Sequence, residues 1–395
     1  MTQIPYVFNQ LTQWIPKDAF DRLVGIYRGN AYVKDYTCWN HLLVMLWAQL
    51  TSRRSLRDIE TSLRAHCDKL YRMGIGRHVS RNNIANSNAR RDVSIYRELA
   101  CRMMCRASTV RMRDKGLAEL AERFSVNGFF AVDSSTVTLS LDRCPWCTPQ
   151  EGRGGVKLHT MYDLIRETPR ICLITGHEER DQTFMEDYPY ESGCVYVFDK
   201  AYMKTAGLAA VNAAGGYFIV RRKKDILYDV LEDNPAGGTV MADRTIRFSG
   251  RCTRRGYPGP LRMVSCYVGG KNEVMQFLTN NTDMPAETVA ALYKYRWKIE
   301  LFFRWIKQHL RITSFYGTSA NAVMVQIYTA FTAYCVLALA ADALKYKGSL
   351  YDFSNLVSVS LTEKVWLKDL ITRYEDAKGD WHDERWPSLF GEVRY

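Results

Sequence analysis

Residues 293–307 read YKYRWKIELFFRWIK and mix charged with aromatic residues. On a helix turning about 100° per residue, Arg296, Glu300 and Lys307 fall within about 60° of Tyr293. One face therefore presents a carboxylate between cations, while the opposite face is apolar and suited to a protein core. The helical pattern runs from about residue 285 to residue 310. The apolar face comprises Tyr295, Ile299, Phe302, Phe303, Ile306 and Leu310.

Two aspartates upstream close short apolar runs of the kind that form buried strands. Asp133 ends the run GFFAVD, and Asp199 ends the run CVYVFD. Strand ends would place these carboxylates together at the edge of a sheet. An Asp after a strand is by itself more often a turn residue. Asp133 and Asp199 both precede Glu300 in the chain.

The spacing of Tyr, Arg, Glu and Lys within residues 293–307 resembles the YREK signature of the insertion-sequence-four family of bacterial transposases. The segments DSST at Asp133 and DKAY at Asp199 resemble that family's first and second carboxylate motifs. The family usually has Arg after the second Asp, where this chain has Lys200. Lys keeps the positive charge of Arg but cannot form the two parallel hydrogen bonds that a guanidinium donates. The resemblance covers roughly residues 1 to 345.

The resemblance implies that Asp133, Asp199 and Glu300 form the catalytic and metal-binding set. Three converging carboxylates repel one another and need cations, and their oxygens suit two Mg²⁺ ions, with Mn²⁺ as a substitute. Such ions activate the attacking oxygen and stabilise the leaving oxygen in phosphodiester displacement. The implied function is a cut-and-paste DNA transposase that binds terminal inverted repeats, then cleaves and transfers strands as a homodimer.

The same resemblance assigns side chains to DNA. Three residues of the signature are expected to hold the backbone of the transposon end, and Trp297 could stack on an unpaired base. Two residues of the second strand, Lys157 and His159, are weaker candidates, because a strand His is more often structural. The expected DNA contacts are Tyr293, Arg296, Trp297, Lys307, Arg304 and Lys200.

The predicted fold class is α/β, with a ribonuclease-H-like catalytic core at 121–317 and a β-rich insertion at 221–272. An all-α DNA-binding domain is expected at 1–120, and a helical C-terminal region at 318–395. Residues 51–115 contain sixteen Lys or Arg against six Asp or Glu. Within them, a glycine turn precedes a polar helix at 80–91, which resembles a helix-turn-helix reader. Its Asn and Arg side chains can pair with adenine and guanine edges.

Composition supports a polyanionic partner. The net charge is +12, from 54 basic and 42 acidic residues. This excess does not identify the partner, but nucleic acid is the leading candidate, and the resemblance implies double-stranded DNA. No secretory signal is apparent, and eleven Cys without a regular framework indicate reduced thiols. We therefore expect a cytoplasmic, nucleoid-associated bacterial protein. The apolar segment 320–344 contains polar interruptions, so it predicts a core helix and no membrane contact.

Two alternatives share parts of this pattern. A non-transposing DNA-binding regulator would use the N-terminal helices alone, although the presence of all three carboxylates argues against it. A ribonuclease-H-like nuclease would cleave DNA without joining a 3′-hydroxyl to a new strand.

Overall fold

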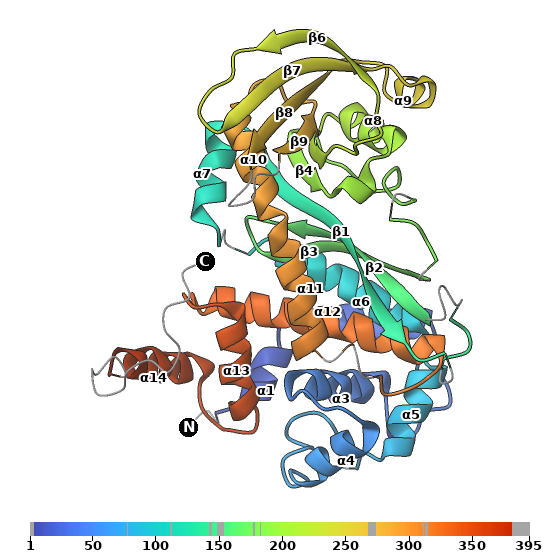
Figure 1. The fold of residues 1–395 in the computed structure, drawn as a ribbon. Coiled ribbons are helices and arrows are strands. Elements are labelled where there is room, and N and C mark those ends of the chain that lie inside the picture. Colours follow the sequence, from blue (N-terminus) through green and yellow to red (C-terminus); the bar gives the residue numbers. More distant parts are fainter. Residues whose placement is uncertain are drawn as a thin grey trace.

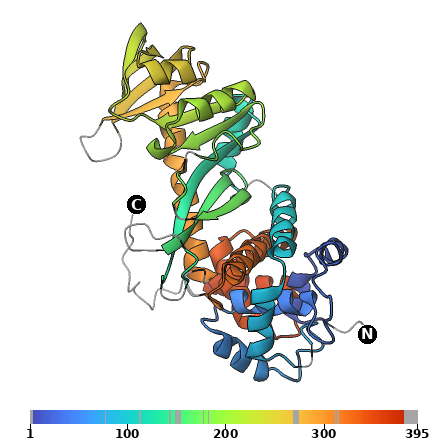
Figure 2. The same ribbon diagram turned by 90° about the vertical axis from the view of Figure 1, so that its right-hand side faces the viewer.

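The computed structural model is a mixed α/β structure in which a large sheet forms one half and helices form the other (Figure 1). Strand β1 is long and runs from the sheet half towards the helical half, and Figure 2 shows the same division from the side. Residues from position 381 onward lie outside the described residues, so part of the predicted C-terminal region stays untested. The described residues are 4–76, 78–110, 113–141, 144–147, 154–176, 178–181, 183–267, 274–310, 312 and 315–380.

The helical half combines the two ends of the chain. Helix α12 packs against α3, α5, α6 and α13, so helices from far apart in the sequence share one core. The N-terminal helices are α1 (Val7–Thr12), α2 (Lys17–Ile26), α3 (Cys38–Leu50), α4 (Leu56–Arg64), α5 (Arg81–Arg90), α6 (Val93–Ala107) and α7 (Lys115–Arg123). The C-terminal helices are α12 (Ala320–Ala343), α13 (Leu350–Ser360) and α14 (Leu367–Asp380).

Among the described residues, nine strands form one sheet in the order β3-β2-β1-β4-β5-β9-β8-β7-β6. Strand β1 is antiparallel to β2 and parallel to β4, and β4 is parallel to β5. The first five strands are β1 (Gly128–Leu139), β2 (Gly154–Asp163), β3 (Thr168–Gly176), β4 (Cys194–Phe198) and β5 (Tyr217–Arg221). Between β4 and β5 the chain forms the short 3₁₀ helix η1 (Lys200–Tyr202) and helix α8 (Thr205–Ala213).

The segment predicted as a β-rich insertion continues the same sheet. Strand β9 returns antiparallel to β5, and β8, β7 and β6 then extend the sheet to its far edge. The elements of this part are β6 (Tyr228–Asn234), β7 (Val240–Phe248), α9 (Arg251–Gly256), β8 (Leu261–Tyr267) and β9 (Val274–Thr279).

The predicted helix over 285–310 is interrupted once. It forms α10 (Ala286–Tyr295) and α11 (Trp297–His309), which meet at Arg296. The Arg296 backbone stays right-handed (φ −52°, ψ −30°), but hydrogen bonds span three residues there, from Arg296 N to Tyr293 O and from Ile299 N to Arg296 O. This three-residue spacing is that of a tighter 3₁₀ turn.

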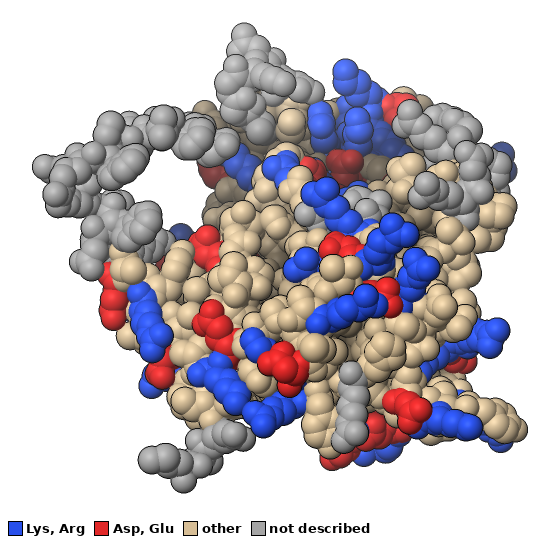
Figure 3. All heavy atoms as spheres, turned by 90° about the horizontal axis from the view of Figure 1, so that it is seen from below, with Lys and Arg blue, Asp and Glu red and all other residues tan. Residues whose placement is uncertain are grey.

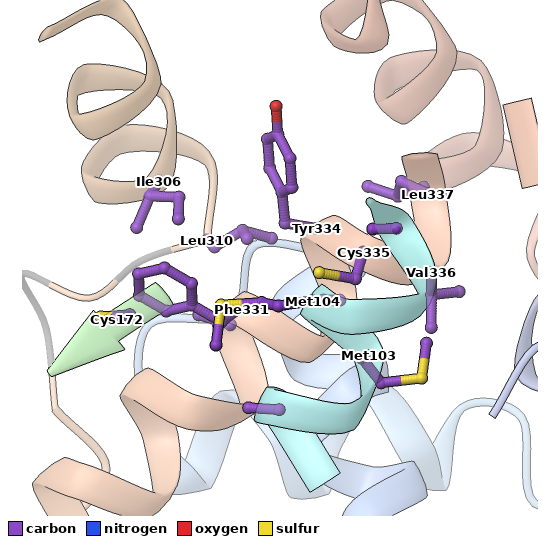
Figure 4. Close-up of a cluster of buried hydrophobic side chains, with 14 of the residues drawn as sticks. Met103, Met104, Cys172, Ile306, Leu310, Phe331, Tyr334, Cys335, Val336 and Leu337 are labelled. Atoms are coloured by element: carbon purple, nitrogen blue, oxygen red, sulfur yellow. The ribbon is translucent and has the colours of Figure 1, made fainter. Parts of the chain in front are cut away.

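Helix α12 forms much of the core of the helical half. Its N-cap Ser319 accepts a hydrogen bond from the backbone of Ala322. Within the described residues it is the one helix long and apolar enough to cross a membrane, but 94% of its most apolar window is buried. The burial agrees with the predicted core helix. Its buried side chains lie among those of neighbouring elements in Figure 4, which labels Met103, Met104, Cys172, Ile306, Leu310, Phe331, Tyr334, Cys335, Val336 and Leu337.

Candidate active site

The two predicted aspartates lie on neighbouring parallel strands. Asp133 belongs to β1, and Asp199 follows the last residue of β4. Val132 of β1 pairs with Phe198 of β4, so each aspartate is the next residue after this pair. Both strands are buried up to this point. The carboxylates therefore stand where two apolar runs end side by side.

Side chains from the junction of α10 and α11 bring the acidic groups together. Arg296 donates from Nη1 to Asp133 Oδ2 (3.1 Å) and from Nη2 to Glu300 Oε1 (2.6 Å). Tyr293 donates from its hydroxyl to Asp199 Oδ1 (3.2 Å). The structure thus connects all three predicted carboxylates through two side chains of the predicted signature.

Burial governs the charge state of this cluster. Burial raises the pKa of Asp133 to about 6, although the Ser134 backbone N–H and Arg296 oppose the shift. The neighbouring Asp199 and Glu300 raise it further. Burial also raises the pKa of the Tyr293 hydroxyl to about 12, which keeps that group a hydrogen-bond donor at neutral pH. The ionisation of Asp133 is therefore opposed by burial and by its acidic neighbours.

The oxygen atoms of Asp133, Asp199 and Glu300 are of the kind that bind a hard divalent cation. Among the described residues, no group of three or more His, Cys, Asp or Glu stands close enough to hold a metal ion. The Arg296 guanidinium forms ion pairs with both Asp133 and Glu300. Carboxylate oxygens on separate elements are the ligands that Mg²⁺ prefers.

The other predicted DNA contacts lie in different surroundings. Lys307 donates to the backbone oxygen of Thr136 in β1 (2.6 Å), and burial lowers its pKa. Trp297 is 50% exposed, and the Arg304 guanidinium lies 5.9 Å from the centre of its ring. Lys200 is exposed in η1. Lys307 thus anchors the helix to β1, whereas Trp297 and Lys200 face solvent.

Lys200 also lines a basic cavity that the sequence reasoning did not identify. The cavity has a volume of about 770 Å³ and is lined by η1, by the end of β5 with the loop that follows it, and by β9. The run RRKK after β5 was visible in the sequence, but the sequence does not show that it folds beside Lys200. The basic residues of the lining are Lys200, Arg221, Arg222, Lys223 and Lys224.

A polar network beside Asp133 was also missed. Ser134 donates its backbone N–H to Asp133 Oδ1 (2.8 Å) and its hydroxyl to Asp181 Oδ1 (2.5 Å). Lys157 forms an ion pair with the same Asp181 oxygen (3.2 Å). The ring of His159 is buried and bonds to the hydroxyl of Thr175 (2.9 Å). Lys157 and His159 therefore hold the hairpin together in this structure.

The predicted polar helix is α5, and it presents part of its Asn and Arg set to solvent. Its predicted cap, Ser80, accepts a hydrogen bond from the backbone of Asn83 (3.2 Å). Asn88 is buried against His41 (2.9 Å), and Arg91 bonds to the carbonyl oxygen of Thr37 (2.6 Å). Figure 3 shows the molecule from below, with basic side chains spread over much of the visible face. The exposed polar residues of α5 are Arg81, Asn82, Asn86 and Arg90.

Comparison with known proteins identifies the class. A family described as "Transposase DDE domain" matches residues 125–336, just over half of the chain. A second family, described as a domain of unknown function (DUF4372), matches residues 4–76. The chain is therefore a transposase.

Proteins similar in sequence to this chain are also named as transposases. The chain is 32% identical over 287 residues to the putative transposase y4zB of Sinorhizobium fredii, covering 71% of this chain and 77% of that protein. It is 24% identical over 368 residues to the putative transposase for insertion sequence element IS4SA of Synechocystis, covering 90% and 99%. A piggyBac transposase synaptic complex with hairpin DNA, solved by cryo-EM, aligns with a TM-score of 0.48 at 9% identity, covering 97% and 86%. The chain belongs to the DDE transposase family, and this membership implies cleavage and transesterification of DNA strands.

Proposed function

We propose that this transposase performs cut-and-paste transposition, with Asp133, Asp199 and Glu300 as its catalytic and metal-binding residues. The observation that carries the proposal is the bridge of Arg296 between Asp133 and Glu300, with Tyr293 bonded to Asp199. Arg296 and Asp133 are 163 positions apart in the sequence, and Tyr293 and Asp199 are 94 positions apart. A purely structural cluster would give these carboxylates no reason to approach one another, because buried like charges oppose folding.

The proposed core is ribonuclease-H-like. The order β3-β2-β1-β4-β5, with β2 antiparallel and the other neighbours of β1 and β4 parallel, supports this assignment. We propose the catalytic domain at 121–317 with its insertion at 221–272. The DNA-binding domain is proposed at 1–120, and the C-terminal region at 318–395.

The protein's own side chains hold the reacting groups in place. Tyr293 orients Asp199 through its hydroxyl, and Lys307 secures α11 to β1 through the carbonyl oxygen of Thr136. When bound by the three carboxylates, two Mg²⁺ ions, or Mn²⁺ in their place, would supply positive charge for the attacking and leaving oxygens of phosphodiester displacement. The Asp133 side chain is only 18% exposed, and partial burial strengthens the electrostatic interactions there.

We propose that DNA contacts the residues around the acidic site and the exposed face of α5. Arg296 and Tyr293 would meet the backbone of the element end, with Trp297, Arg304 and Lys200 at exposed positions nearby. Lys307 would have to leave its carbonyl partner to reach a phosphate. Helix α5 would read the terminal inverted repeat with its exposed Asn and Arg side chains. Pairing of two ends requires a homodimer, acting on the nucleoid in the bacterial cytoplasm.

The test is cleavage and joining of DNA that carries the element's own terminal inverted repeats. Purified protein with Mg²⁺ is expected to cut at the repeat boundary and to join the freed 3′-hydroxyl to a target duplex. Asp199→Asn should abolish both steps while the protein still binds the repeat. Asp229→Asn, which alters an exposed carboxylate on the edge strand β6, serves as the matched control.

The outcomes separate the alternatives. Cutting without joining would favour a ribonuclease-H-like nuclease, and repeat binding without metal-dependent cutting would favour a regulator. Full activity of Asp199→Asn would refute the proposed catalytic set. Light scattering of the end complex tests the dimer, and a strictly monomeric complex would contradict it.

A further inference from the structure

Arg296 occupies the position between two carboxylates. Its two terminal nitrogens bond to Asp133 and Glu300 at 3.1 and 2.6 Å, and its side chain is only 15% exposed. No other Lys, Arg or His forms an ion pair with Asp133 or Glu300 in the described part of the chain. The guanidinium therefore supplies the positive charge that keeps these two acidic groups together.

This charge is needed because the site is self-repelling without it. Burial and the neighbouring Asp199 and Glu300 all raise the pKa of Asp133, and Arg296 opposes them. Burial disfavours the charged form of Arg296, yet the surrounding Tyr293, Glu300 and Asp133 hold its pKa above the usual value. The Asp133 carboxylate and the Arg296 guanidinium thus favour each other's charged forms.

We propose that Arg296 is the resident counter-ion of the DNA-free site and competes with divalent metal for Asp133 and Glu300. An incoming DNA phosphate would take over the guanidinium, releasing both carboxylates for metal. DNA binding and metal binding would then favour each other through the displacement of one side chain. This inference rests on the proposed metal-dependent function.

The surroundings of Arg296 suit such a movement. The residue lies at the junction of α10 and α11, where the four-residue hydrogen-bond pattern is interrupted. Its Nε is buried and has no hydrogen-bond partner among the described residues, so the present arrangement does not satisfy the whole guanidinium. A phosphate can accept two parallel hydrogen bonds from this group. A phosphate bound to Arg296 would therefore replace the hydrogen bonds from its guanidinium to Asp133 and Glu300.

Linkage gives the size of the expected effect. If metal must displace Arg296 in the free protein, two charged hydrogen bonds must break first, and this lowers the affinity for metal. Coupling between two ligands commonly changes an affinity about fivefold to 150-fold, and the change is the same in both directions. We therefore expect a gain of at least about tenfold in metal affinity when Arg296 is neutralised or drawn away.

The experiment measures Mn²⁺ binding by electron paramagnetic resonance with the full chain. Wild type is compared with Arg296→Gln, which removes the charge and keeps a polar side chain. Lys294→Gln is the matched control, because Lys294 is an exposed cation two residues away on α10. Each protein is titrated alone and with a pre-cleaved duplex taken from the end of the element, which contains no bond left to cut.

The expected result is tighter Mn²⁺ binding by free Arg296→Gln than by free wild type, by about tenfold or more, with Lys294→Gln unchanged. The duplex should tighten Mn²⁺ binding to wild type and add little to Arg296→Gln. Equal or weaker binding by free Arg296→Gln, or no effect of the duplex on wild type, overturns the inference.

A parallel cleavage assay on wild type distinguishes failure of the counter-ion role from failure of the proposed function. Mg²⁺-dependent cleavage together with unchanged Mn²⁺ affinity of Arg296→Gln leaves the proposed function standing and rejects the counter-ion role. Absence of both Mn²⁺ binding and metal-dependent cleavage rejects the proposed function, and the counter-ion role with it.

Discussion

Replacing Asp133 by Asn is expected to stabilise the folded protein above pH 6. Burial is the main cause that raises the pKa of Asp133 from 3.8 to about 6, and the side chain is only 18% exposed. Each tenfold change in proton affinity corresponds to about 1.4 kcal/mol, so the ionised carboxylate lowers the free energy of unfolding by about 3 kcal/mol. Asn has nearly the same size and cannot ionise, and its oxygen can still accept from the Ser134 N–H. Its amide nitrogen then faces Arg296 Nη1 in place of Oδ2, so the lost contact makes about 3 kcal/mol the upper limit of the gain.

The sign follows from the direction of the shift. Because the folded pKa lies above the unfolded value, the folded state binds the proton more tightly, and this stabilisation is complete below pH 3.8. It is lost as the pH rises to about 6 and stays lost above that. The gain of Asp133→Asn over wild type should therefore be at most about 3 kcal/mol at pH 7.5, and about 2 kcal/mol smaller at pH 4.5 than at pH 7.5.

Urea unfolding followed by tryptophan fluorescence measures this difference, with a chelator present so that no divalent ion binds the carboxylates. Wild type, Asp133→Asn and the exposed control Asp229→Asn are compared at both pH values. The control should match wild type throughout. The reasoning is refuted if Asp133→Asn is no more stable than wild type at pH 7.5, or if its advantage is the same at both pH values.

Three further substitutions test other contacts. Tyr293→Phe removes the donor to Asp199 and should slow single-turnover cleavage about fivefold, since such a bond contributes about 1 kcal/mol; an unchanged rate would exclude a role in orientation. Lys298→Met leaves two carboxylates without the ammonium that bridges them at 2.7 Å, so urea titration should show a loss of about 2 kcal/mol, and a neutral effect would contradict this. Phe331→Ala empties a fully buried position in α12 and should cost about 3–5 kcal/mol by the same measurement; a cost below about 1 kcal/mol would mean that the core closes around the gap.

Much of the acidic site was predictable because it depends on strong local patterns. Asp133 and Asp199 each end an apolar run, and buried strands are among the clearest signals in a sequence. Glu300 and Arg296 are four residues apart, which places them on one helix face. These rules predict which way each side chain points from its strand or helix. In the structure Arg296 links Asp133 to Glu300, and Tyr293 bonds to Asp199.

The contacts within the site were not predictable in the same way. The helical pattern placed Lys307 on the face of Glu300, but its ammonium reaches the backbone of Thr136. Asp181 lies in an irregular connection after β3, where no periodicity marks a residue that bonds to Ser134. Helical spacing predicts the face on which a side chain lies, whereas the choice between a phosphate, a carboxylate and a backbone carbonyl depends on tertiary packing.

The insertion and the helix that carries Glu300 depend on each other for their positions. Arg262 of β8 forms a buried ion pair with Asp243 of β7 (2.6 Å), and it also donates to the carbonyl oxygens of Thr282 and Met284. Those two residues lie in the connection that leads from β9 into α10. A buried charge pair is costly to break on one side, so the insertion strands hold the start of this helix firmly. The insertion thereby fixes where the chain re-enters the core after the second Asp, and with it the distance of Glu300 from the two strands that carry the aspartates.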